Sequence, residues 1–136
     1  MSFGNTTETD LLEKIFKATT IPWDGNSNLY LALHTADPGE TGVQTTSEAT
    51  YTSYARVTVS RSGTGWTVSN PTATNAALVQ FPTCTGSTNT ITHVSIGTAS
   101  SGTGQILVKG ALNSSLSVSS GIQPQFSAGA LVFTLD

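Results

Sequence analysis

The sequence has 136 residues, of which 41 are Ser or Thr and only 13 carry a formal charge. Five scattered basic residues and a net charge of −3 exclude nucleic-acid binding, because too few phosphates could be neutralised. A single cysteine excludes an intrachain disulfide, and no apolar run reaches the roughly 18 residues that a membrane-spanning helix needs.

The first predicted element is an amphipathic helix over residues 7–18. Thr7 followed by Asp10 has the spacing of a capping box, although Asp replaces the usual Glu or Gln. Apolar side chains then recur at helical spacing and form one stripe, which consists of Leu11, Leu12, Ile15 and Phe16. The stripe either packs on the protein's own sheet, which we favour, or contacts a partner subunit.

After residue 24 the sequence predicts β-structure. Strand-like segments separated by short turns lie at residues 28–34, 54–60, 66–69, 77–81, 90–98, 105–112, 116–119 and 130–135. This spacing predicts one mainly β domain over residues 1–136, an antiparallel β-sandwich of jelly-roll or immunoglobulin-like type with about seven to nine strands. Apolar residues at a period of two are the expected core, namely Ile106, Val108, Leu131, Phe133 and Leu135.

A polar stretch follows the first predicted strand. It begins with a turn at residues 37–40, where Pro presets φ and Gly permits the chain to reverse. Residues 41–52 have no clear period and are expected to form a long exposed loop. For the whole loop over residues 37–52 we give equal weight to partner contact and to a disordered surface loop. The side chains expected to contact a partner, besides the helix stripe, are Asp37, Glu40, Glu48, Tyr51 and Arg56.

No residue pattern indicates catalysis or a cofactor. His34 and His93 lie in different predicted strands, are expected to be partly exposed, and have no local ligand pair for a metal. Asp37 and Glu40 could share a calcium ion, but a solvated turn is the favoured interpretation. Cys84 has no basic neighbour and is expected to be an inert, buried or half-buried thiol. The sequence therefore predicts no enzyme, metal, cofactor or small-molecule substrate.

Several segments resemble one protein family in the same order along the chain. They are NLYLALHTADPGE at residues 28–40, YARV at 54–57, residues 69–77 and 81–82, THVSIG at 92–97, and residues 110–112 and 126–136. The chain thus resembles a widespread family of small virion proteins of tailed phages and prophages, variously labelled tail fibre, minor structural or head decoration protein. The resemblance implies a phage structural protein and brings no catalytic residues.

Within this family we expect a capsid decoration (cement) protein that binds the outside of the phage head and stabilises contacts between major capsid subunits. A tail-fibre shaft needs length and repeats, and the chain has neither. We expect a homo-oligomer, a dimer or a trimer, on the major capsid protein. The first residues lack the pattern of a secretory signal, so assembly is expected in the host cytoplasm.

The alternative is a tail-associated module of the tail-fibre type, either structural or binding a receptor or carbohydrate. Aromatic side chains could line a sugar-binding groove, but core or interface positions are favoured for Trp23, Tyr30, Tyr51, Tyr54 and Trp66. Eleven of the 13 charges lie in residues 1–61. We therefore expect salt-sensitive attachment through the N-terminal half, and high salt should loosen it without unfolding the domain.

Overall fold

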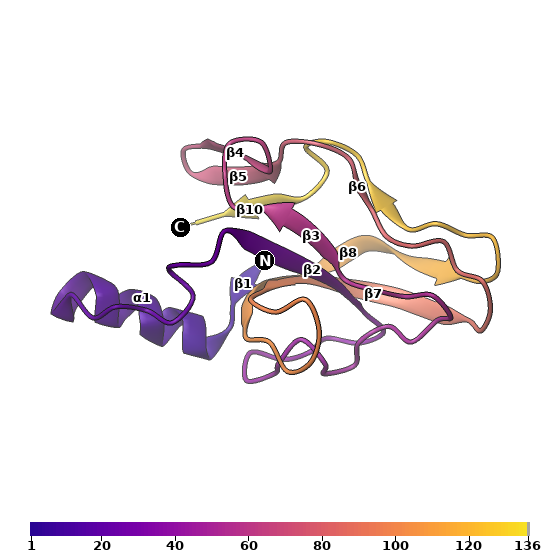
Figure 1. Ribbon diagram of the computed structural model, residues 1–136, viewed down its shortest axis with the longest axis horizontal. Helices are drawn as coiled ribbons and strands as arrows, with labels where there is room; N and C mark the ends of the chain where they lie inside the picture. The colour runs from indigo at the N-terminus through magenta and orange to yellow at the C-terminus, as the bar shows by residue number, and fades with distance from the viewer. Residues whose placement is uncertain (136) are drawn as a thin grey trace.

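The computed structural model describes residues 1–135, which form one helix and ten strands (Figure 1). The elements are β1 (Ser2–Phe3), α1 (Asn5–Lys17), β2 (Asn28–His34), β3 (Val57–Ser60), β4 (Trp66–Ser69), β5 (Thr72–Asn75), β6 (Val79–Gln80), β7 (Asn89–Gly97), β8 (Ile106–Val118), β9 (Gln125–Phe126) and β10 (Val132–Thr134). The helix within these residues is too short and too polar to cross a membrane.

The strands form three antiparallel sheets. The largest has five strands in the order β1-β8-β7-β2-β3, and the others have the orders β10-β5-β4 and β6-β9. β2 lies between β3 and β7, so that Leu31 lies opposite Val57 of β3 on one side and Ile96 of β7 on the other. The prediction of a mainly β, antiparallel fold with an N-terminal helix is confirmed, whereas the jelly-roll or immunoglobulin-like sandwich stays a prediction.

The core joins the large sheet to both smaller ones. Leu31 and Leu33 of β2 pack in one cluster with Phe81, which follows β6, and with Leu131, which precedes β10. Cys84 belongs to the same cluster and is 1% exposed, so the predicted buried thiol is confirmed. Burial of this apolar surface is the main driving force that holds the sheets together.

The predicted strand boundaries differ from the structure mainly in the second half. β8 is one strand of 13 residues where two were predicted, because the register against β7 shifts between Ile91 and His93 and the strand continues through the irregularity. The short strands β1, β5 and β9 were not predicted. Ile106 and Leu131 are buried as expected, but Leu135 is 61% exposed, and its prediction as a core residue is wrong.

Helix α1 begins two residues earlier than predicted and ends one residue earlier. Its N-cap is Gly4, whose N–H donates to the Leu107 carbonyl at 3.2 Å. A side chain at Gly4 would place its Cβ 2.6 Å from the Ile106 carbonyl oxygen, so only glycine fits this close approach to β8. Thr7 does not cap the helix; its buried hydroxyl donates instead to the Ile106 carbonyl at 3.0 Å. Ala18 follows in the left-handed conformation.

Candidate functional site

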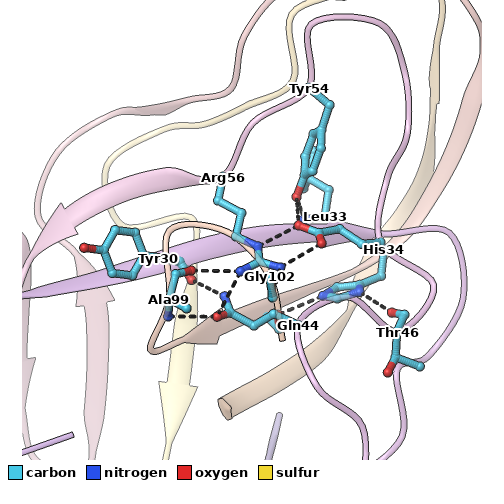
Figure 2. Close-up of polar contacts among 11 residues, drawn as sticks. Tyr30, Leu33, His34, Gln44, Thr46, Tyr54, Arg56, Ala99 and Gly102 are labelled. Atoms are coloured by element: carbon cyan, nitrogen blue, oxygen red, sulfur yellow. Dashed lines mark hydrogen bonds and ion pairs between the residues drawn. The ribbon is translucent and has the colours of Figure 1, made fainter. Parts of the chain in front are cut away.

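Arg56 organises a buried polar network (Figure 2). Its side chain is 3% exposed, and its Nε and Nη2 donate to the two Glu48 carboxylate oxygens at 2.7 and 2.8 Å. The same guanidinium donates to the carbonyls of Ala99 at 2.9 Å and Gly102 at 2.7 Å. Arg56 is thereby joined to Glu48 by a bidentate ion pair, and to the turn between β7 and β8 by two hydrogen bonds.

Gln44 continues the network inside the protein (Figure 2). Its amide nitrogen donates to the Tyr30 carbonyl at 3.1 Å, and its amide oxygen accepts from the Ala99 N–H at 3.0 Å. Gly97 and Gly104 lie directly against the Gln44 side chain, where a Cβ on either glycine would collide with it. Gln44 was not predicted as a buried residue, because most of its neighbours in the sequence are polar and show no apolar pattern.

His34 is fully buried, so the expectation of a partly exposed histidine is wrong for this residue. Its Nδ1 lies 2.8 Å from the Thr46 carbonyl and therefore donates to it, while its Nε2 accepts from the Ser95 hydroxyl at 2.7 Å. Burial lowers the pKa of His34 below its usual value. His34 is thus a neutral structural residue that anchors the segment after β2. His93 of β7 is half-buried.

Two tyrosines attach the same segment to the core. Tyr54 donates its hydroxyl to Glu48 at 2.9 Å and accepts from the Leu33 N–H at 3.1 Å. Tyr51 is 2% exposed and donates to the Pro82 carbonyl at 2.9 Å. Burial raises the pKa of both phenols, to about 12 for Tyr51.

The prediction of a long exposed loop over residues 41–52 is therefore only partly correct, because exposed positions alternate with the buried Gln44, Ala49 and Tyr51. Its polar groups are satisfied by hydrogen bonds within the chain, which lets much of the segment pack inside. Tyr51 and Arg56 are buried and Glu48 is nearly so. These three side chains stabilise the fold and are enclosed in this structure, so they are not available for contact with a partner.

Asp37 and Glu40 remain accessible to solvent, and each has its own contacts within the chain. Asp37 forms an ion pair with Lys109 at 2.9 Å. The Gly39 N–H and then Lys109 hold the pKa of Asp37 below its usual range. Glu40 is exposed, and its carbonyl accepts from the Asn5 N–H at 2.9 Å. Residues 1–135 contain no group of three or more His, Cys, Asp or Glu side chains that could hold a metal. Partner contact by these two residues stays a prediction.

The apolar stripe of α1 is the clearest candidate for an interaction surface. Leu12, Ile15 and Phe16 are 57%, 69% and 78% exposed, and we call these three residues the helix face. Leu11 is partly buried. Figure 1 shows α1 extending sideways beyond the sheets, with only its first turns near β8. The favoured prediction that the stripe packs on the protein's own sheet is wrong, and contact with a partner subunit is the alternative that remains.

Comparison with known protein families shows which family the chain belongs to. Residues 2–134 match the model of the family Gp80, described as podophage GP4 fiber I protein gp80. A search of curated proteins finds no significant match. The resemblance to phage virion proteins is therefore supported, and the fibre label agrees better with the tail-fibre alternative than with capsid decoration. Because the match covers nearly the whole chain, the chain belongs to this podophage fibre-protein family and is a non-enzymatic structural protein of a phage virion.

Proposed function

We propose that this chain is a structural subunit of a podophage tail fibre and acts by binding other virion subunits. The family match over residues 2–134 is the observation that carries the proposal. It replaces our expectation of a cement protein on the head. That expectation depended on the absence of shaft repeats, but a fibre assembly can also contain compact subunits that attach to a shaft or form its end.

The surface of the described residues is consistent with binding through contact rather than with enclosing a small ligand. The two hollows that stand out have volumes of about 140 and 180 Å³, whereas small-molecule sites usually measure roughly 300–1,000 Å³. The aromatic side chains are not gathered on one exposed face. The Arg61 guanidinium lies over the Trp23 ring at 5.3 Å, and Trp66 packs edge-to-face against Phe133.

Immunogold labelling and cryo-electron microscopy of virions would test the proposed location. An antibody raised against the purified chain should label the tail, at few copies per particle. Particles from a phage with the gene interrupted should lose the label together with fibre density, which controls for cross-reaction. Label spread over the head at hundreds of copies would overturn the proposal and restore the cement interpretation.

A further inference from the structure

Strand β3 forms an open edge of the five-stranded sheet (Figure 1). It pairs with β2 in a regular antiparallel register. That register continues past the strand, where the Arg61 N–H donates to the Ser27 carbonyl at 2.9 Å. In an antiparallel pair, residues that bond the neighbouring strand alternate with residues whose backbone groups point away from it. Counting back from Arg61, every second residue bonds β2, so the backbone N–H and C=O groups of Thr58 and Ser60 point outward.

These outward groups have no backbone hydrogen-bond partner within the described residues 1–135. Thr58 and Ser60 are both exposed. A Cβ on Gly65 would collide with the Ser60 carbonyl oxygen, so Gly65 covers that one group. The Thr58 N–H, the Thr58 C=O and the Ser60 N–H remain open. They form a row of donor, acceptor and donor, which is the pattern that the backbone of another strand satisfies.

A hollow of about 180 Å³ lies along this edge. It is lined by β3, by residues 64–65 and by residues 77–79, and none of these residues is charged. The lining combines hydroxyl groups with apolar side chains, among them the half-buried Val59 and the half-exposed Leu78. Such a hollow fits an uncharged segment, because a charged group would lose contact with water there without gaining a counter-charge.

The edge of β3 lacks the features with which sheets usually prevent the addition of a strand. Its sequence, Val-Thr-Val-Ser, contains no proline and no charge, and its register against β2 has no bulge. At the opposite edge of the same sheet, β1 has only two residues, and a very short edge strand is one of those protective features. The β3 edge is therefore open both in its hydrogen bonding and in its sequence.

We propose that β3 binds an extended, uncharged segment of another virion subunit, which adds to the five-stranded sheet as one more strand. Main-chain hydrogen bonds to Thr58 and Ser60 give such a segment its affinity, and the apolar lining of the hollow selects its side chains. A separate segment fits the hollow better than a second copy, because each strand of the described residues already belongs to a sheet that would have to enter with it. The inference rests on the proposed function, since it names the kind of partner that the chain binds.

Hydrogen–deuterium exchange resolved to single residues, on the free chain and on virions, would test the strand pairing. The amides of Thr58 and Ser60 should exchange at least tenfold more slowly in the virion, because a new strand covers them. Val68 supplies the control amide. The Ala76 N–H donates to the Gly65 carbonyl, so Val68 also points away from its neighbouring strand, β5, and its exchange should not change. An unprotected Thr58 in virions that contain the chain would overturn this inference alone, since the immunogold labelling judges the tail location separately.

Proline substitution separates backbone pairing from side-chain contact. Thr58→Pro removes an outward N–H but none of the hydrogen bonds to β2, and it should lower the number of copies per virion at least tenfold when it replaces the wild-type chain. Thr58→Ala keeps the N–H, and Val68→Pro makes the same backbone change on β4, so both should change the copy number less than twofold. Circular dichroism should show that the variants are folded; if Thr58→Pro is not, the exchange measurement decides. Normal incorporation of Thr58→Pro, or an equal loss in either other variant, would overturn the proposal.

Discussion

The helix face and the segment over residues 41–56 form an instructive pair. Both contain side chains that the sequence offers as candidate partner contacts, and the structure places them in opposite environments. The helix face consists of large apolar side chains that are mostly exposed to solvent. The segment contains an arginine, a glutamate and a glutamine that are largely enclosed. Residue type alone would have assigned the interior and the surface the other way round.

Hydrogen bonding accounts for the difference. A polar group can be buried at low cost only when its bonding capacity is met, and Arg56, Glu48 and Gln44 meet theirs within the chain. Among the described residues, Trp66 Nε1 is the one buried side-chain nitrogen or oxygen without a partner. The helix instead uses polar side chains to attach to its own protein, which leaves the apolar side uncovered. The pairing of polar groups, rather than hydrophobicity, therefore determines which of these two regions is buried.

The largest expected effect comes from breaking the buried network. Arg56→Ala leaves the Glu48 carboxylate enclosed without its ion pair, and removal of one partner from such a pair costs about 3–5 kcal/mol of unfolding free energy. Urea denaturation followed by tryptophan fluorescence would measure the loss. Lys17→Ala is the control, because the Lys17 side chain is 68% exposed and, within the described residues, pairs only with Glu13 on the same helix; this change should cost much less than Arg56→Ala, since exposed ion pairs contribute little. Equal losses would mean that Arg56 has no special role.

Acid should weaken the same region through His34. Burial is the main cause that lowers the folded pKa of His34, and Arg56 and His93 lower it further. Thr46 and Glu48 act in the opposite direction but do not cancel the effect. The folded state therefore binds fewer protons than the unfolded chain, so stability falls as the pH drops below the unfolded pKa of about 6.5. Between pH 7 and pH 5 the loss should reach at most about 2 kcal/mol.

Urea denaturation at a series of pH values would measure this slope. The carboxyl of Asp37 has a lowered pKa and loses its stabilising contribution only in more acidic solution, so it does not interfere in this range. His34→Gln supplies the control, because glutamine does not titrate and should flatten the slope whatever its effect on overall stability. A slope that survives in the variant would assign the pH dependence to another group.

Sequence patterns predicted the secondary structure better than they predicted which side chains are buried. Period-two alternation correctly located β2, and helical spacing located α1 to within two residues at either end, because both signals are local. The burial of Gln44 depends on the close approach of Gly97 and Gly104, which are more than 50 residues away along the chain. Such long-range contacts leave no local pattern to read.

The count of charges in the sequence also does not reveal which charges are paired in the folded chain. The concentration of charges in residues 1–61 suggested salt-sensitive attachment, but many of them are paired within the chain, including Lys14 with Asp24, Lys17 with Glu13 and Arg56 with Glu48. Paired charges offer less to a partner than the count implies. Salt-dependent attachment stays a prediction, and the structure shifts the emphasis from charge to the apolar helix face.

The smallest expected effect tests the other half of the comparison, the two sides of α1. Phe16→Ser should change the unfolding free energy of the monomer by no more than about 0.5 kcal/mol, because an exposed side chain loses little packing when it is shortened. Thr7→Val on the opposite side should cost about 1–2 kcal/mol, since the Ile106 carbonyl and the Gln105 amide both lose a partner. Urea denaturation at low micromolar protein would measure both changes. If Phe16→Ser proved as costly as Thr7→Val, the helix face would be packed in the free protein and would not be an accessible surface.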